Sequence, residues 1–161
     1  MAVLDDIPQA NATYAASFAG PQDAPPRRQL AVIACMDARL DLLPALGLEI
    51  GDAHVIRNAG GIPTEDVLRS LAISQHELGT HEVAVIHHTG CGMGGFDDEA
   101  FRARLATDTG VTPGWDVPGF TDIAADVRRS AQTVRDCPWL PHRDNVRGYV
   151  FDVASGTVTE A

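Results

Sequence analysis

The sequence predicts an α/β fold with a mostly parallel central sheet flanked by helices, an N-terminal helical arm and a C-terminal β-hairpin. Short continuous apolar runs, at residues 30–34 and 82–88, are typical of strands that are buried on both faces of a parallel sheet. Segments with apolar residues at helical spacing alternate with these runs. The 161 residues are enough for one domain with a substantial core.

The elements can be placed in order along the chain. An Ala-rich start and a following stretch with three prolines predict a helix and then a linker. We expect a single domain, 1–161, with an N-terminal arm and linker over 1–28 and an α/β core over 29–161. The expected elements are a helix over 1–19, strands over 30–34, 53–57, 82–88 and 147–153, helices over 41–46, 64–78, 96–105 and 121–135, and a hairpin strand over 157–159.

The helix over 64–78 has the clearest signals. Thr64 can cap its start, two acidic residues occupy its first turn, and Gly79 can stop it. Its apolar residues follow helical spacing, and Gln75 is the one polar member of that stripe. At the other end of the chain, the Ala-Ser-Gly sequence at 154–156 predicts the tight turn of the C-terminal hairpin.

Charge and composition exclude several classes of function. The formal net charge is −10, and all twelve basic residues are arginine. We therefore expect neither a nucleic acid nor an anionic membrane as a partner. Without lysine there is no Schiff-base lysine, no pyridoxal phosphate anchor and no Walker lysine. No apolar stretch is long enough to cross a bilayer, and the acidic N-terminus lacks the basic region of a secretory signal, so we expect a cytoplasmic protein.

Two cysteines and one histidine form the main candidate site. Cys35 follows the first strand, His88 ends the strand over 82–88, and Cys91 comes three residues later. The carboxyl ends of parallel strands share one edge of the sheet, where open α/β sheets bind ligands. Two thiolates and one imidazole suit a zinc ion, and three protein ligands leave a fourth position for exchange. The third cysteine, Cys137, is expected to be a buried apolar side chain.

Asp37 and Arg39 lie close to the first ligand. An ordinary surface ion pair is one interpretation; a carboxylate held by arginine beside the metal is the one we favour. Because a zinc ion with two thiolates and one imidazole is formally neutral, its bound water needs help to lose a proton. Asp37 could orient a zinc-bound hydroxide, or it could bind the metal as a fourth ligand and release Arg39. The sequence leaves both arrangements open.

Two nearby features suggest other interpretations. Because side chains alternate along a strand, His87 and His88 point to opposite faces, so His87 is expected to be a core or interface histidine. The loop over 90–95 also fits the G-x-G-x-x-G pattern of dinucleotide-binding proteins. That pattern needs a strand ending in an acid about twenty residues later. Asp116 is near that distance but lies in a predicted loop, so a nucleotide site is not expected.

The paired motifs resemble the β-class carbonic anhydrases. The resemblance covers roughly residues 30–153 and includes the Arg-Asn-Ala-Gly sequence at 57–60. It implies that Cys35, His88 and Cys91 bind Zn²⁺. It also implies that Asp37 and Arg39 form the catalytic dyad, with Asp37 able to become the fourth metal ligand.

The resemblance implies zinc-dependent reversible hydration of carbon dioxide to bicarbonate by metal-bound hydroxide. It also implies a homodimer or dimer-based oligomer, in which the N-terminal helix packs on the partner subunit. The chain departs from many members at Met36 and Ala38, where they carry serine, and it lacks a clear equivalent of an upstream glutamine. Two alternatives are therefore a carbonyl sulfide or carbon disulfide hydrolase on the same scaffold and, from another class, a non-catalytic zinc-binding regulatory protein.

Overall fold

A computed structural model describes residues 2–161 and contains the expected alternation of strands and helices. The five strands and one 3₁₀ turn (η1) are β1 (Leu30–Cys35), β2 (Ala53–Asn58), η1 (Ala59–Gly61), β3 (Glu82–His88), β4 (Val146–Phe151) and β5 (Val158–Glu160). The helices are α1 (Val3–Ala15), α2 (Leu42–Ala45), α3 (Glu65–His76), α4 (Asp98–Thr109) and α5 (Ile123–Asp136).

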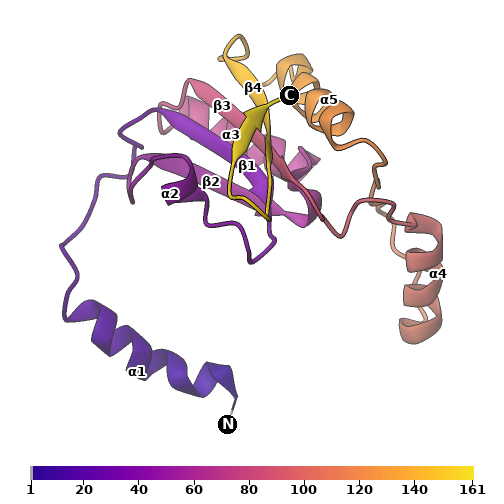
Figure 1. Cartoon of the computed structure of the whole chain (residues 1–161), viewed down its shortest axis with the longest axis horizontal. Helices are drawn as coiled ribbons and strands as arrows, with labels where there is room; N and C mark the ends of the chain where they lie inside the picture. Colours follow the sequence, from indigo (N-terminus) through magenta and orange to yellow (C-terminus); the bar gives the residue numbers. More distant parts are fainter. Residues whose placement is uncertain (1) are drawn as a thin grey trace.

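The strands form one sheet in the order β2-β1-β3-β4-β5 (Figure 1). The first four are parallel, and β5 runs antiparallel to β4 as the expected C-terminal hairpin. The register places Cys35 beside Asn58 and His88 beside Phe151. Strands β1 and β3 pair directly, with Ala34 beside Ile86, so their carboxyl ends lie next to each other.

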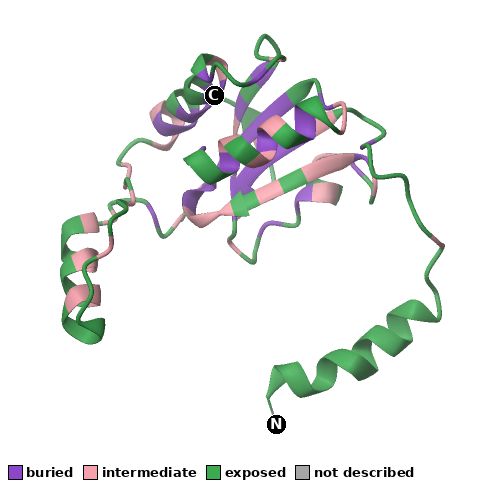
Figure 2. Ribbon diagram, turned by 180° about the vertical axis from the view of Figure 1, so that it is seen from behind, coloured by how far each residue is buried: buried purple, intermediate pink, exposed green. Residues whose placement is uncertain are grey.

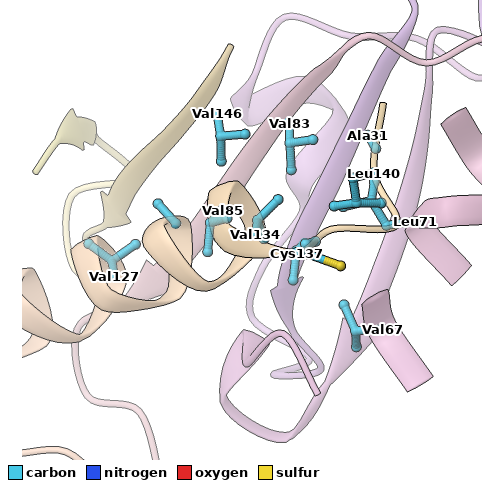
Figure 3. Packing of buried hydrophobic residues seen from close by; sticks show 12 residues of the cluster. Ala31, Val67, Leu71, Val83, Val85, Val127, Val134, Cys137, Leu140 and Val146 are labelled. Carbon is cyan, nitrogen blue, oxygen red and sulfur yellow. The ribbon is translucent and has the colours of Figure 1, made fainter. Parts of the chain in front are cut away.

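The larger core lies between one face of the sheet and helices α3 and α5. Alternate residues of β1, β3 and β4 meet apolar residues of both helices there (Figure 3). Its buried members are Ala31, Ile33, Val67, Leu71, Val83, Val85, Val127, Ala131, Val134, Cys137, Leu140 and Val146. Cys137 is thus a core side chain, as expected, and it lies on the face of the sheet opposite Cys35.

The second face carries a smaller core that includes part of the candidate site. Cys35 packs there with Leu40 and Leu42, and Cys91 contacts the edge of the same cluster. The short helix α2 and the loop after β1 provide this cover. The helical cover is therefore thicker on the face that carries α3 and α5, and thinner on the face that carries Cys35 and Cys91.

Helices α1 and α4 extend away from the sheet (Figures 1 and 2). Neither buries a residue. The linker after α1 is nevertheless anchored, because Arg27 donates a hydrogen bond of 2.9 Å from Nε to Asp52 and another of 3.0 Å to the carbonyl of Ile50. Of the arm expected over 1–28, Met1 lies outside the described residues; in the rest, α1 buries no residue and the linker that follows it is held by Arg27.

Several element boundaries differ from the expectation. Thr64 occupies the N-cap position of α3, but its side chain makes no capping hydrogen bond. The helix expected over 96–105 begins at Asp98, because Asp97 caps it through the backbone N–H of Ala100, and it continues to Thr109.

The polar residue in the α3 stripe has a structural explanation. Gln75 is buried, and its amide forms two hydrogen bonds, of 2.9 and 3.1 Å, with the backbone carbonyl and N–H of His142. The side chain therefore ties α3 to the loop before β4. Among the described residues, no helix has the length and apolar character required to span a membrane.

Candidate metal centre

The structure brings the three expected ligands together. Cys35 is the last residue of β1, His88 is the last residue of β3, and Cys91 lies in the loop that follows β3. Their ligand atoms all lie within 4.8 Å of one another, and the two sulfur atoms are 4.0 Å apart. Residues from two neighbouring strand ends therefore converge on one point, as the parallel topology requires.

The surroundings of His88 favour the tautomer that a metal ligand needs. Nδ1 of His88 lies 3.0 Å from the carbonyl oxygen of Thr89, which can only accept a hydrogen bond, so the contact favours a proton on Nδ1. The other ring nitrogen, Nε2, is buried without a hydrogen-bond partner. A buried polar atom without a partner is costly, and a bound cation would satisfy it. The donor set of two sulfurs and one nitrogen fits Zn²⁺.

The charge balance of the two cysteines also fits a cation. Burial raises the pKa of the Cys91 thiol, and the neighbouring Cys35 raises it further. The backbone N–H of Met93, 3.5 Å from the Cys91 sulfur, acts in the opposite direction by donating a hydrogen bond. Two thiolates this close, one on the buried Cys35 and one on the half-buried Cys91, would repel each other, and a positive ion between them would offset that repulsion.

Asp37 and Arg39 form a tight pair beside the ligands. Arg39 donates three hydrogen bonds to the carboxylate, from its backbone N–H (2.9 Å), from Nε (2.9 Å) and from Nη2 (2.7 Å). These bonds hold the pKa of Asp37 well below its usual range, and they raise the pKa of Arg39. The nearer carboxylate oxygen is 3.8 Å from Nε2 of His88. Asp37 is thus ionised and adjacent to the ligand cluster while paired with Arg39.

Arg57 holds the loop that carries this pair, a contact that sequence reasoning did not identify. Its guanidinium donates to three carbonyl oxygens, those of Cys35 (2.9 Å), Asp37 (2.6 Å) and Leu40 (3.4 Å). One side chain from β2 therefore fixes both ends and the middle of the loop after β1. The sequence places Arg57 at the end of a predicted strand and within the Arg-Asn-Ala-Gly sequence of the family resemblance, but neither signal indicates which groups its side chain contacts.

The loop after β3 is held in a similar way by Asp152. Its carboxylate accepts hydrogen bonds from the Thr89 hydroxyl (3.0 Å), the Ala154 N–H (3.0 Å) and the Ser155 hydroxyl (2.9 Å). The Thr89 hydroxyl in turn accepts from the N–H of Val153. These bonds lower the pKa of Asp152 below its ordinary value. The β-turn after β4 is therefore connected to the chain between His88 and Cys91.

The Asp152 contacts give a pH-dependent contribution to stability. Because its folded pKa lies below the value of about 3.9 for an unfolded aspartate, the contribution is complete above that pH and is lost as pH falls through the folded pKa. We expect Asp152→Asn to lower the melting temperature at neutral pH, with a gap to the original protein that narrows between about pH 5 and about pH 3. Thermal unfolding followed by circular dichroism across this range measures the gap; a constant gap would contradict the assignment.

His87 lies on the opposite face from His88, as strand alternation predicts. The ring is buried, and Nε2 is 3.3 Å from the carbonyl oxygen of Gly61. Burial lowers the pKa of His87 to about 4. The hydrogen bond to Gly61 acts in the opposite direction but is the smaller effect, and the nearby His88 and Arg129 lower the pKa of His87 further. The Asp126 carboxylate, 3.1 Å from Nδ1, pairs with Arg129. His87 is thus a neutral core histidine and not a fourth ligand.

A cavity of about 570 Å³ opens beside the ligands. His88 and Cys91 form part of its wall, and the side chains of Phe120 and Ile123 provide apolar surface. The glycine-rich loop over 90–95 forms another part: Gly94 pairs with Phe120 in a parallel bridge, and the N–H of Gly95 donates to the Phe120 carbonyl (2.7 Å). These glycines therefore line the cavity at the metal centre. Asp116 lies in a loop, as expected, so the acid-ended strand of a dinucleotide site is absent there.

Comparison with known proteins gives one consistent family. A family model described as carbonic anhydrase matches residues 30–112. The chain is 46% identical to β-carbonic anhydrase 1 of Mycobacterium tuberculosis over 160 residues, covering 99% of this chain and 98% of that protein. It is also 33% identical to a carbon disulfide hydrolase of Acidithiobacillus thiooxidans, covering 82% of this chain and 76% of that protein. A crystal structure of a carbonic anhydrase from Streptococcus mutans superposes with a TM-score of 0.91 at 40% identity, covering 99% of this chain and 98% of that one.

Proposed function

Because this chain belongs to the β-carbonic anhydrase family, we propose that it catalyses the zinc-dependent reversible hydration of carbon dioxide to bicarbonate. The observation that carries the proposal is the convergence of Cys35, His88 and Cys91 within 4.8 Å, with Nε2 of His88 lacking any other partner. The Asp37–Arg39 pair beside this cluster favours catalysis over a purely structural metal site.

Each residue has a distinct task in this proposal. Cys35, His88 and Cys91 would hold the zinc ion, which when bound lowers the pKa of a water molecule toward neutrality and so supplies hydroxide as the nucleophile. Asp37 accepts a hydrogen bond from that nucleophile and orients it toward the carbon atom. Arg39 keeps the carboxylate ionised and, through a 3.0 Å hydrogen bond to the carbonyl of Gly90, joins the loops that follow β1 and β3.

The cavity suits a small apolar gas. Phe120 and Ile123 give the wall beside His88 and Cys91 an apolar part, and among the described residues no charged side chain lines the cavity apart from the proposed metal ligands, although Thr89 and Thr121 also contribute to it. The product is an anion, and the cationic Arg39 lies on the adjoining loop. The apolar part of the wall and the nearby cation together suit a reaction in which a neutral substrate becomes an anionic product.

Stopped-flow measurement of carbon dioxide hydration by the zinc-loaded protein tests the proposal. We expect turnover above the buffer rate that rises between about pH 6 and about pH 9, because the attacking water must lose its proton. A rate equal to that of buffer throughout this range would reject the assigned reaction. A flat profile with real turnover would reject the deprotonation step.

Hydrolysis of carbonyl sulfide or carbon disulfide is the second candidate. The observation in its favour is the 33% identity with a protein named carbon disulfide hydrolase. Both gases are linear, neutral and small, so the same cavity could admit them. Turnover on the three gases under identical conditions separates the candidates: we expect carbon dioxide to have the highest kcat/KM, and a higher value for either sulfur gas would reassign the substrate.

We propose that the enzyme is a homodimer or an assembly of dimers joined in part by α1. This helix buries nothing within its own chain, although Leu4, Ile7, Tyr14 and Phe18 are all exposed on or just after it. A second copy of the chain could cover this apolar surface.

Deletion of residues 2–19 is expected to halve the mass of the assembly, because it removes the apolar arm and leaves the Arg27 anchor in place. Light scattering after size-exclusion chromatography measures the mass. The matched control is Asp6→Asn, which changes the charge of the same helix and keeps its apolar residues. An unchanged mass after the deletion would contradict a role for α1 in assembly.

A further inference from the structure

His87 is a buried polar side chain with no task in the proposed reaction. Only 1% of it is exposed, and it lies on the face of β3 opposite the metal ligands. Burying a polar ring in the interior costs free energy unless its hydrogen bonds and packing contacts offset that cost. Its contacts lead to three segments: the η1 turn, the residue Phe120, and helix α5. Two of these segments also touch the chain around the metal ligands.

The first path leads from His87 to Cys35. Nε2 of His87 lies 3.3 Å from the carbonyl oxygen of Gly61 in the η1 turn. Gly61 has φ = +68°, and a Cβ atom there would lie 2.8 Å from both Ala34 C and Cys35 N. The turn therefore packs directly against the peptide bond that precedes Cys35. A shift of Gly61 would displace that ligand.

The second path leads from His87 to the loop after Cys91. The imidazole stacks on Phe120, with ring centroids 6.1 Å apart and an angle of 28° between the planes. Phe120 accepts from the N–H of Gly95 (2.7 Å) and donates to the carbonyl of Met93 (3.2 Å). Its ring also lines the cavity at the metal centre. The position of Phe120 therefore fixes the loop that carries Cys91.

The third neighbour of the ring is a carboxylate on α5. Asp126 is also buried, its carboxylate lies 3.1 Å from Nδ1 of His87 without forming a hydrogen bond to it, and Arg129 pairs with the same carboxylate. Helix α5 itself packs on the main core of the sheet. His87 thus lies between the turn behind Cys35, the loop after Cys91 and helix α5.

We propose that His87 is a positioning residue of the metal centre: its hydrogen bond to Gly61 and its packing on Phe120 set the distance between Cys35 and Cys91. The inference rests on the ligand set of the proposed function. The ring itself does not touch the metal or the substrate. Its effect on the metal passes through the backbone of η1 on one side and through Phe120 on the other.

Two substitutions separate the hydrogen bond from the volume of the ring. His87→Phe keeps an aromatic ring against Phe120 and removes the donor to Gly61. His87→Gln places an amide N–H near the former Nε2 and restores the donor. If His87 positions the ligands, the Phe variant is impaired and the Gln variant is close to the original protein. A role limited to filling space would give the opposite order.

Cobalt(II) uptake gives a readout that does not depend on catalysis. In the original protein, Co²⁺ bound by two thiolates produces charge-transfer bands, and competition with a chelator gives the affinity. We expect His87→Phe to weaken metal binding by about tenfold or more and to change the band intensities, as found for residues that orient ligands. His87→Gln should remain within about threefold of the original affinity.

Val134→Ala is the matched control for lost stability. It removes buried apolar volume from the same helix, α5, about two turns beyond Asp126. It should lower the melting temperature and leave the cobalt spectrum and affinity unchanged. If His87→Phe does not fold, His87→Asn takes its place, because its shorter amide does not reach Gly61.

Three outcomes are distinguishable. Normal cobalt affinity and spectra in His87→Phe, or in His87→Asn where that variant is used, would overturn the positioning role and leave the proposed function intact. Absence of thiolate–cobalt bands in the original protein would instead overturn the ligand set itself. Weakened binding in Val134→Ala equal to that in His87→Phe would also overturn the inference, because loss of stability would then explain both.

Discussion

Cys35→Ala is expected to remove the metal and to reduce carbon dioxide hydration to near the buffer rate. The substitution deletes one of three ligands, and a remaining imidazole and thiolate cannot hold zinc at the same affinity. Metal analysis should show a fall from about one zinc per chain to below about 0.1, with a loss of kcat/KM of at least about 10³-fold. Stopped-flow assays on the same preparation measure the loss.

Cys137→Ala is the control for the loss of a thiol. Cys137 is as buried as Cys35, with both 5% exposed, but it lies in the other core, beneath α3 and α5. We expect it to keep the zinc and the activity and to lose a modest amount of stability, about 1 kcal/mol. Retention of stoichiometric zinc by Cys35→Ala, or loss of zinc by Cys137→Ala, would contradict the assigned ligands.

Asp37→Asn is expected to reduce turnover while the zinc remains bound. The amide keeps the shape of the carboxylate but removes its charge, and with it most of the attraction to Arg39. An amide also accepts a hydrogen bond less strongly from the nucleophile. We expect kcat/KM for carbon dioxide hydration to fall by roughly 10²-fold, with zinc content unchanged.

The same substitution distinguishes an enzyme from a non-catalytic zinc protein. In a closed site with four protein ligands, Asp37 would hold the metal, and Asp37→Asn would weaken zinc binding with no reaction to slow. Asp41→Asn is the control, because Asp41 is an exposed aspartate on the same loop whose side chain caps nothing. Loss of zinc in Asp37→Asn alone would therefore favour the non-catalytic reading.

The sheet and the ligand cluster could be predicted because the relevant signals are local. The apolar runs at 30–34 and 82–88 fix two buried strands, and parallel strands align their carboxyl ends. Cys35 and His88 then fall at neighbouring strand ends without any knowledge of the tertiary structure. Because side chains alternate along a strand, the sequence also predicts that His87 and His88 point to opposite faces of the sheet.

The contacts that hold the site in place could not be predicted, because they join a side chain to backbone groups far away in sequence. Nothing in the pattern around Arg57 shows that its donors reach three carbonyls after β1. In the sequence Gln75 is only a polar residue in an otherwise apolar stripe, and its hydrogen-bond partner, the backbone of His142, lies 67 residues away. The sequence predicts a start at residue 96 for α4, whereas the helix begins at Asp98, because the Asp97 side chain caps it.

X-ray absorption at the zinc edge of the purified protein tests the central claim most directly. The account predicts one zinc per chain with two sulfur neighbours at about 2.3 Å and the remaining neighbours, nitrogen or oxygen, at about 2.0–2.1 Å. A first shell without sulfur, or purified protein that binds no zinc when supplied with it, would show that Cys35, His88 and Cys91 do not hold one metal ion.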